Sequence, residues 1–401
     1  MRLHSRHSQP AENRPNPNSN RPTSSRRSRG QKILRVILIL IALGLAGTCI
    51  ALLLISRSGS NLFNAGRLDF PDPIYDTLTG LEITDATLNS SPTYCVQIPN
   101  GTDGARPQAG LTHAAVVFEA IAEAGITRFA AIFQNPNTSV IGPIRSLRPY
   151  SLDWDTPFDC TVVHAGGSDE AITALRAGGH RELDESITYM WREYGTNRSW
   201  NNLFTSPADL TAWNHAQGWD TSNPTGFSRL IPDDVDLLLR DRAACAEDPE
   251  CTPEPLVTDI TLEFGSWNTF NTLYQYDAAT NTYLRSYANG TAHLVYDCPA
   301  DLSRPITTTA CGELVQVAPS VVIAMIVEEH RMADGYHEAI TTIGSGPAYI
   351  FQNGTATVGT WEKSSQSSQL RFLDAGGAEI SLTPGQTWIA AIPEYGEVSY
   401  E

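Results

Sequence analysis

The pattern of apolar and polar residues between positions 141 and 175 predicts a strand, a tight turn and a helix. The β-branched run from Cys160 to Val163 is typical of a buried strand. Two glycines follow, Gly166 and Gly167, which permit positive φ angles and a close approach to the backbone. Ser168 then has the position of an N-cap before an apolar-periodic helix. Because the first N–H groups of a helix have no partner within it, we expect this turn to be able to hold an anion.

Two apolar runs lie between Ala115 and Gln134, on either side of a Glu-Ala-Gly bend. They fit a β-hairpin and equally a helix followed by a strand, because periodicity does not separate these structures in short apolar runs. Further along, residues 221–255 combine an Asp- and Arg-rich helical pattern, typical of an exposed helix, with a short loop between two cysteines. We place a domain boundary at the end of this stretch.

Beyond residue 255 the pattern changes to short alternating runs bounded by turn residues, such as TLYQY, TYLRSYA and AHLVYD. Asn289-Gly290 and Asn353-Gly354 each lie between two such runs, and Asn-Gly favours the type I′ turn of a β-hairpin. The sequence therefore predicts an α+β protein. Its N-terminal mixed α/β domain occupies residues 75–254, and its mostly antiparallel β domain occupies residues 255–401.

The segment before the first domain predicts a membrane anchor. Residues 1–32 are rich in Arg, Ser, Pro and Asn and predict a disordered basic tail, because so few apolar residues cannot offset the entropy lost on ordering. Residues 33–56 predict a transmembrane helix, since the twenty residues from Val36 to Ile55 carry no charge. At about 1.5 Å per residue they span about 30 Å of hydrocarbon. Residues 57–74 predict a linker.

The arginines before this span place the N-terminus in the cytoplasm, so we expect a single-pass protein of the cell membrane with an extracytoplasmic body. A cleaved signal peptide is the alternative, although the apolar region of a signal peptide is usually shorter. Lipidation of Cys49 is disfavoured, because Thr48 stands where such sites prefer Gly, Ala or Ser and because the apolar run continues beyond Cys49.

Net charge separates the tail from the body. The chain of 401 residues has a formal net charge of −17, and residues 1–35 contribute +8 through nine basic residues and one acidic residue, so the remainder carries −25. This acidity argues against nucleic-acid binding by the folded domains, since neutralising phosphates needs Lys and Arg surfaces. The hydrophobic content of 41% suffices for a large core.

Six cysteines lie in the body, an even number in a compartment that permits disulfides. Spacing favours two short-loop pairings and leaves one long-range pairing: Cys245 with Cys251, Cys298 with Cys311, and Cys95 with Cys160. A zinc site is disfavoured, because no pair has C-x-x-C spacing and no histidine follows at ligand spacing. We expect neither a metal nor another cofactor.

Four arginines stand out in the acidic body, because arginine binds carboxylate and phosphate groups through two parallel hydrogen bonds. They are Arg106, Arg128, Arg145 and Arg148. Together with Gly166 and Gly167 they are the candidate ligand-binding residues. The alternative is structural pairing of these arginines with protein carboxylates such as Glu119, Asp153 or Asp155.

His164 and Ser168 are the candidate catalytic residues, as base and nucleophile, and Glu119 is a further candidate as a carboxylate. The alternative is a histidine at the end of a strand and a serine that caps a helix. The chain contains no G-x-S-x-G elbow, no P-loop and no H-E-x-x-H motif. Whether the protein is an enzyme is therefore open at this point.

A series of motifs carries a resemblance to a known family. The N-terminal part contains, in order, ARPQAGLTHAAVVFEAIAEAGITRFAAIFQ, IGPIRSLRPY, VVHAGGSDEA and NNLFTS, and the C-terminal part contains IGSGPAYIFQNGTATVGTWEK and LTPGQTWIAAIP. Over roughly residues 73–395 the chain resembles the YerB-like family of two-domain, extracytoplasmic bacterial proteins of unknown function. The resemblance implies a location outside the cell and assigns no activity. The chain departs from the family in its transmembrane helix, which replaces a lipidated cysteine, and in its extra cysteines, which suggest a different envelope.

Two functions remain. The first is a membrane-anchored, non-catalytic protein that binds an anionic cell-envelope fragment or polymer through its arginines. The second is a cell-envelope hydrolase or transferase acting through His164 and Ser168 or through Glu119. Convergence of the arginines on one concave pocket would favour the first, whereas His164 within about 3 Å of Ser168 in an open cleft would favour the second.

Overall fold

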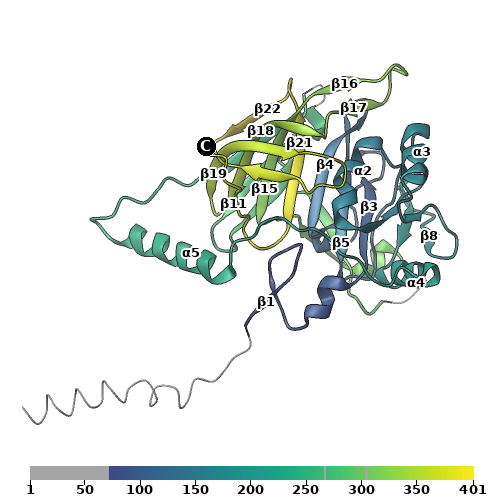
Figure 1. Ribbon diagram of the computed structural model, residues 1–401, viewed down its shortest axis with the longest axis horizontal. Coiled ribbons are helices and arrows are strands. Elements are labelled where there is room, and N and C mark those ends of the chain that lie inside the picture. The colour runs from purple at the N-terminus through teal and green to yellow at the C-terminus, as the bar shows by residue number, and fades with distance from the viewer. Residues whose placement is uncertain (1–71, 266–267, 303–305) are drawn as a thin grey trace, which may run out of the picture. The chain divides into compact units, whose positions relative to one another are not determined.

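A computed structural model describes residues 72–265, 268–302 and 306–401 of the chain (Figure 1). Residues 73–401 form one compact unit. The predicted basic tail and the predicted transmembrane helix at residues 33–56 lie outside the described residues. None of the helices that the structure describes is long and apolar enough to span a membrane.

A mixed sheet of ten strands is the largest element of the described residues. In spatial order its strands are β20 (Arg371–Leu373), β19 (Thr355–Lys363), β18 (Gly344–Gln352), β15 (Val321–Val327), β21 (Thr387–Pro393), β4 (Val116–Glu123), β5 (Ile126–Gln134), β3 (Thr93–Pro99), β6 (Cys160–Val163) and β7 (Glu182–Leu183). Strand β21 pairs in parallel with β15 and with β4, and β6 pairs in parallel with β3 and β7. The other neighbours are antiparallel. Strands from both predicted domains thus share one sheet, and the boundary near residue 254 stays a prediction.

A second, antiparallel sheet consists of β12 (Thr282–Tyr287), β11 (Thr272–Asp277), β10 (Asp259–Glu263) and β22 (Glu397–Tyr400). Short two-stranded pairs complete the strands: β1 (Ile74–Tyr75) with β2 (Glu82–Ile83), β8 (Met190–Arg192) with β9 (Leu203–Thr205), β13 (Leu294–Asp297) with β14 (Glu313–Gln316), and β16 (Glu329–Arg331) with β17 (Glu338–Ile340). The C-terminal region is therefore mostly antiparallel, and the N-terminal region is mixed α/β, as the hydrophobic pattern predicts.

The described α-helices belong to the N-terminal region and the segment that follows it: α2 (Pro149–Asp155), α3 (Asp169–Ala177), α4 (Pro207–Gln217) and α5 (Pro232–Glu247). The predicted strand, turn and helix are confirmed, because α3 follows β6 and the Oγ of Ser168 accepts a hydrogen bond from the N–H of Ala171 at 3.3 Å. The predicted exposed helix is α5, in which Val235 alone is buried.

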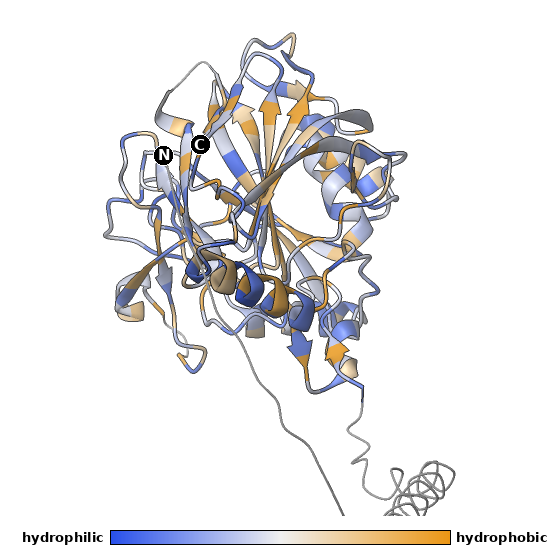
Figure 2. Ribbon diagram, turned by 90° about the vertical axis from the view of Figure 1, so that its left-hand side faces the viewer, coloured by the Kyte–Doolittle hydropathy of each residue, from blue (hydrophilic) through white to orange (hydrophobic). Residues whose placement is uncertain are grey.

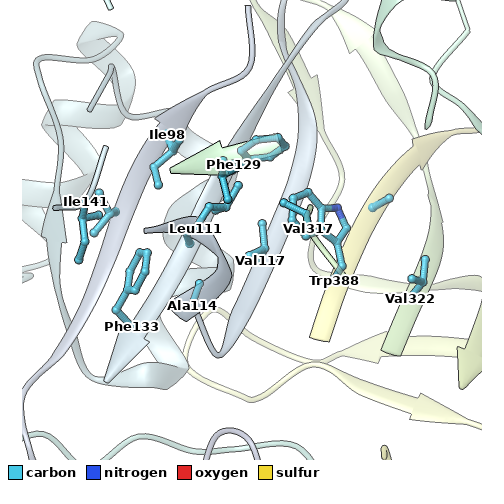
Figure 3. Close-up of a cluster of buried hydrophobic side chains, with 14 of the residues drawn as sticks. Ile98, Leu111, Ala114, Val117, Phe129, Phe133, Ile141, Val317, Val322 and Trp388 are labelled. Atoms are coloured by element: carbon cyan, nitrogen blue, oxygen red, sulfur yellow. The ribbon is translucent and has the colours of Figure 1, made fainter. Parts of the chain in front are cut away.

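Alternate residues of the strands point into two cores on opposite faces of the large sheet. Val117 packs with residues of the four-stranded sheet such as Tyr274, whereas its neighbour Phe118 packs against α2, where its ring stacks on Trp154 at 5.0 Å. Figure 2 shows hydrophobic residues gathered along the strands, and Figure 3 shows Val117, Phe129 and Trp388 in the first of the two cores. The period of two along a strand thus decides which core each side chain joins.

The segment between Ala115 and Gln134 is a hairpin of β4 and β5, turning at Ala124 and Gly125 with φ angles of 48° and 79°. Asn353 and Gly354 also have positive φ angles, 53° and 67°, and join β18 to β19, as expected for a type I′ turn. Asn289-Gly290 differs: Gly290 alone has a positive φ, and the side chain of Asn289 accepts a hydrogen bond from the N–H of Thr291 at 3.0 Å.

All three predicted disulfides are present. Cys95 on β3 pairs with Cys160 on the neighbouring strand β6, across 65 residues of sequence. The two others close short loops, Cys245 with Cys251 and Cys298 with Cys311. Disulfides persist in oxidising compartments, which agrees with an extracytoplasmic body.

Candidate functional site

A buried ion pair joins the two sheets. Glu119 of β4 lies on the face that meets the four-stranded sheet, and the Nη2 of Arg285 on β12 donates to both of its carboxylate oxygens at 3.0 and 2.9 Å. Both side chains are fully buried. The carboxylate also accepts hydrogen bonds from the indole N–H of Trp388 at 2.9 Å and the hydroxyl of Thr127 at 2.9 Å. Glu119 is thus fully engaged by protein groups.

The remaining donors of Arg285 are also satisfied within the protein. Its Nε donates to the hydroxyl of Tyr274 at 3.2 Å, its Nη1 donates to the Nδ1 of His293, and its guanidinium lies 4.7 Å from the ring centre of Trp388. Burial, followed by the positive charge of Arg285, holds the pKa of His293 well below its usual value, so its imidazole is neutral. Its Nε2–H then donates to the Oε1 of Gln108 at 3.0 Å.

Arg106 lies at the end of this network and forms no ion pair with a carboxylate of the described residues. Its Nε donates to the Oδ1 of Asn100 at 2.9 Å, and its guanidinium lies 3.8 Å from the ring centre of Tyr287. Within the part of the chain that the structure describes, neither its buried Nη2 nor the buried hydroxyl of Tyr287 has a hydrogen-bond partner. Burial, and then the charge of Arg285, lower the pKa of Arg106 to about 10, which leaves the guanidinium charged at neutral pH.

A cavity of about 510 Å³ lies at Arg106 and Tyr287. Most of its lining surface is apolar, and among the described residues it is lined by Thr102, Arg106, Thr269, Tyr287, Ala288, Asn289 and Thr291, most of which are exposed to solvent. Thr102 and Arg106 come from the loop between β3 and β4, whereas the other lining residues follow residue 255. Both predicted domains therefore contribute to this cavity, which we call the Arg106 cavity.

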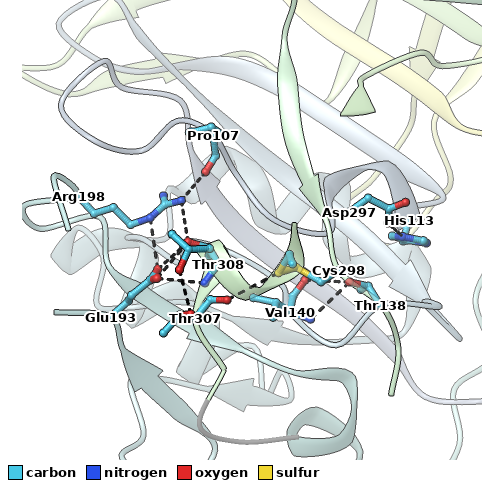
Figure 4. The surroundings of a disulfide bond; sticks show 12 residues. Pro107, His113, Thr138, Val140, Glu193, Arg198, Asp297, Cys298, Thr307 and Thr308 are labelled. Carbon is cyan, nitrogen blue, oxygen red and sulfur yellow. Dashed lines mark hydrogen bonds and ion pairs between the residues drawn. A yellow bond between two sulfur atoms is a disulfide. The ribbon is translucent and has the colours of Figure 1, made fainter. Parts of the chain in front are cut away.

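The loop that carries Arg106 is bonded at the next residue, Pro107, by Arg198, and Figure 4 shows this contact. The Nη2 of Arg198 donates to the carbonyl oxygen of Pro107 at 2.9 Å, and its Nε lies 3.4 Å from the carboxylate of Glu193. Glu193 in turn accepts the N–H of Thr308 at 3.0 Å, in the short helical segment that ends at the disulfide-bonded Cys311. The position of Arg106 thus depends on contacts from several segments.

Arg128 and Arg148 share one carboxylate on the opposite face of the large sheet. The Nη2 of Arg128 lies 2.6 Å from Glu123 and that of Arg148 lies 2.5 Å from the other oxygen of Glu123. Arg128 also donates to the carbonyl oxygen of Ser146 at 2.8 Å. Burial raises the pKa of Glu123, but the two arginines outweigh this effect and hold it below its usual value. These arginines form a buried structural cluster, apart from the Arg106 cavity.

Arg145 lies beside the predicted Gly166-Gly167 turn. Its N–H donates to the carbonyl oxygen of Gln97 at 2.9 Å and its carbonyl oxygen accepts from Ala165 at 3.1 Å, while its half-buried guanidinium forms no hydrogen bond or ion pair with the described residues. The N–H of Gly166, however, already donates to the carboxylate of Asp184 at 2.9 Å. The N–H of Gly166 is therefore not free for an anion, and the predicted anion site at this turn stays a prediction.

His164 and Ser168 are close in sequence, but no hydrogen bond among the described residues joins them. The buried imidazole of His164 is bonded through Nδ1 to the carbonyl oxygen of Gly166 at 2.9 Å, and its Nε2 lies 3.4 Å from Glu182. The Oγ of Ser168 caps α3. In the described part of the chain, no hydrogen bond joins Ser168 to a general base. Within the described ranges, no three His, Cys, Asp or Glu side chains come together as metal ligands.

Sequence reasoning missed Arg285, Tyr287 and His293. One signal was available, because Arg285 stands at an inward position of the alternating run TYLRSYA, two residues after the buried Tyr283. Glu119 likewise interrupts the apolar run of β4. A charged residue on the apolar face of a strand predicts a buried partner, although it does not say which one.

Comparisons with known proteins match both parts of the chain. Residues 78–220 match the N-terminal domain, and residues 260–389 the C-terminal domain, of the family described as "Protein of unknown function (DUF3048)". Arg106 lies in the first range and Tyr287 in the second, whereas α5 lies between them.

One relative is the "Putative lipoprotein YerB" of Bacillus subtilis (strain 168). It is 26% identical over 326 residues, which cover 80% of this chain and 87% of the relative. A crystal structure of the YerB protein from Bacillus subtilis has a similar fold, with a TM-score of 0.60 and 24% sequence identity. The match covers 81% of this chain and 99% of that structure.

Proposed function

The chain belongs to the DUF3048 family, and we propose that it is a membrane-anchored extracytoplasmic protein that binds an anionic fragment or polymer of the cell envelope through Arg106. One observation carries the proposal. Arg106 lines a cavity, and with the residues described here it forms no ion pair, while its buried Nη2 has no hydrogen bond. An uncompensated buried charge is costly, and an anionic ligand would remove that cost.

Three features support a membrane-anchored protein whose folded body lies outside the cytoplasm. The three disulfides fit an oxidising compartment. The similar YerB protein is named as a lipoprotein, which suggests a protein attached to a membrane. The apolar stretch from Val36 to Ile55, preceded by arginines, is the proposed anchor. The cell envelope is then the nearest source of anionic polymers.

Binding of the full-length chain to isolated cell-wall polymer tests the proposal. Arg106→Gln removes the charge but keeps a side chain that can still bond to Asn100, and we expect it to lower the affinity by about 1.5 to 3 kcal/mol, the range for losing a charge-assisted hydrogen bond. Arg106→Lys should recover only part of this loss, because an ammonium group does not reproduce the planar fork. Co-sedimentation at several polymer concentrations gives the affinities.

Two further variants make the result specific. Arg176→Gln is the matched control, since Arg176 is an exposed arginine paired with Glu182, and its binding should equal that of the unmodified protein. Arg145→Gln tests the alternative site beside Gly166. Loss of binding in Arg145→Gln with full binding in Arg106→Gln would move the site to Arg145 and refute the proposal for Arg106.

A protease added outside intact cells tests the proposed anchor. We expect it to remove the body and leave a membrane-held piece of about sixty residues, because the span would end near residue 56. The variant Cys49→Ser should stay bound to the membrane, since the proposed anchor is a helix. Release of Cys49→Ser into the medium would instead show anchoring by a lipidated cysteine, as the name of the YerB relative suggests for that protein.

A further inference from the structure

Three Asn-Gly dipeptides occur in the chain, and their surroundings differ. They begin at Asn100, Asn289 and Asn353. Asn100 is 0% exposed and Asn353 is 5% exposed, whereas Asn289 is exposed in the turn that follows β12. In an Asn-Gly pair the backbone nitrogen of the glycine can reach the amide carbon of the asparagine, because glycine has no side chain to hinder the approach. Burial thus distinguishes three sites of the same local sequence.

The two buried asparagines are held by residues remote in sequence or in the adjoining loop. The Oδ1 of Asn100 accepts a hydrogen bond from the Nε of Arg106 at 2.9 Å. The Oδ1 of Asn353 accepts two hydrogen bonds, from the Nδ2 of Asn281 at 2.9 Å and from the hydroxyl of Thr383 at 3.0 Å. Turning either side chain toward the next backbone nitrogen therefore breaks buried hydrogen bonds, which is costly.

The turn at Asn289 is held only by short-range hydrogen bonds of the turn itself. The Oδ1 of Asn289 accepts from the N–H of Thr291 at 3.0 Å, and the N–H of Gly290 donates to the carbonyl oxygen of Tyr287 at 2.8 Å. The space beside Gly290 is open, since a Cβ built there would meet no atom within 4 Å. Such an exposed turn opens locally at a much lower free energy than a buried segment.

We infer that Asn289 is a site of spontaneous deamidation, which converts its neutral amide into a carboxylate at the Arg106 cavity. The backbone nitrogen of Gly290 forms a bond to the Cγ of Asn289 and gives up its proton, and the side-chain nitrogen leaves with that proton as ammonia. Water then opens the five-membered imide at either carbonyl group, which leaves aspartate or isoaspartate. The N–H of Thr291 is placed to stabilise the negative charge that develops on Oδ1 during the attack.

The new carboxylate would change the Arg106 cavity, because Asn289 is part of the cavity lining. A carboxylate of this type is ionised at neutral pH, so deamidation adds one negative charge to the cavity. This charge attracts the guanidinium of Arg106 and repels an anionic ligand. The deamidated protein should therefore bind an anionic envelope polymer more weakly. This consequence rests on the proposed function, whereas the deamidation itself does not.

Mass spectrometry of peptides tests the modification. The full-length chain is incubated in mildly alkaline buffer, which favours loss of the proton from the attacking nitrogen, and is then digested. We expect conversion of amide to acid at Asn289 to be at least about tenfold faster than at Asn100 or Asn353. In denaturant the three rates should become similar, because the local sequences are alike. The variant Asn289→Gln is the matched control, since its longer side chain must close a six-membered ring and should convert far more slowly.

Equal conversion of the three asparagines in the folded protein, or no conversion at Asn289, would overturn the inference. Neither outcome would affect the proposed function, which rests on Arg106.

Co-sedimentation with cell-wall polymer tests the effect on binding. Asn289→Asp reproduces one product of the reaction, and we expect it to lower the affinity about three- to tenfold relative to freshly purified protein. Incubation should lower the affinity of the original chain in proportion to the converted fraction, whereas it should not change that of Asn289→Gln. Full affinity of Asn289→Asp, with binding lost in Arg106→Gln, would overturn the inferred effect of deamidation and leave the proposed function standing. Full binding by Arg106→Gln would refute the proposed function, while the peptide masses would still decide whether Asn289 is modified.

Discussion

Glu119→Ala is expected to lower the free energy of unfolding by about 3 to 5 kcal/mol, because removing one partner of a buried ion pair leaves the other charge uncompensated. Arg285 would keep its hydrogen bonds to Tyr274 and His293 but lose both bonds to the carboxylate. Trp388 would also lose the acceptor of its indole N–H. Denaturant unfolding of the full-length chain, followed by tryptophan fluorescence, measures the loss.

The double variant Glu119→Leu/Arg285→Met shows whether the loss comes from the unpaired charge. Replacing both ionised groups by apolar ones of similar size should restore part of the stability, since neither charge then remains buried, while the indole N–H of Trp388 and the hydroxyl of Thr127 stay without their acceptor. Arg176→Ala is the control, because its ion pair with Glu182 is exposed, and its unfolding curve should match that of the unmodified protein. A stability of Glu119→Ala equal to that of Arg176→Ala would contradict the structural role assigned to this pair.

Removal of the Cys95–Cys160 disulfide is expected to lower the free energy of unfolding by about 4 kcal/mol. This bond closes a loop of 65 residues and therefore restricts the unfolded chain more than the two short-loop bonds do. The Cys245–Cys251 disulfide, with a separation of 6 residues, should contribute about 2 kcal/mol in the same chain-entropy model. Two double Cys→Ala variants, one for each bond, are compared by denaturant unfolding under non-reducing conditions.

The two disulfides also differ in their surroundings. Cys95 is buried between β3 and β6, whereas Cys245 and Cys251 lie at the end of the largely exposed helix α5. Equal losses in the two double variants would contradict the loop-length argument. A much larger loss at Cys95 and Cys160 than about 4 kcal/mol would indicate that packing between the strands, in addition to loop closure, holds this part of the sheet.

Several features of this protein could be predicted from the sequence because they depend on neighbouring residues. The run Cys160–Val163, the glycines after it and the N-cap Ser168 determine the local path from β6 to α3. Asn353-Gly354 determines a hairpin turn in the same way, since both residues tolerate positive φ. The three disulfides follow from the spacing of the cysteines. In each case the deciding interaction lies within one segment or follows by elimination.

The local sequence did not determine the structure where a segment could adopt two conformations. The runs on either side of Ala124 fit a helix or a strand. They form a hairpin because both of its strands have neighbours in the large sheet, β21 on one side and β3 on the other. At Asn289 the local preference for a type I′ turn is overridden, and its side chain caps the turn while Asn289 itself lines the Arg106 cavity. Between Ala115 and Gln134, tertiary neighbours thus decided between conformations that the sequence permits, whereas at Asn289 a local side-chain hydrogen bond stabilises the turn.

The sequence by itself determined the residue types, the strand and helix patterns and the acidic body in which a few arginines stand out. Only the tertiary structure decided what those arginines do. Arg128 and Arg148 meet Glu123 because the hairpin end of β4 and β5 and the start of α2 converge there. Glu119 meets a partner 166 residues away because β4 and β12 belong to sheets that face each other. Arg106 has no ion-pair partner among the described residues, because Glu119, the carboxylate that acts on it electrostatically, is bonded to Arg285. Which charges neutralise one another depends on distances between segments remote in sequence, and these distances exist only in the folded chain.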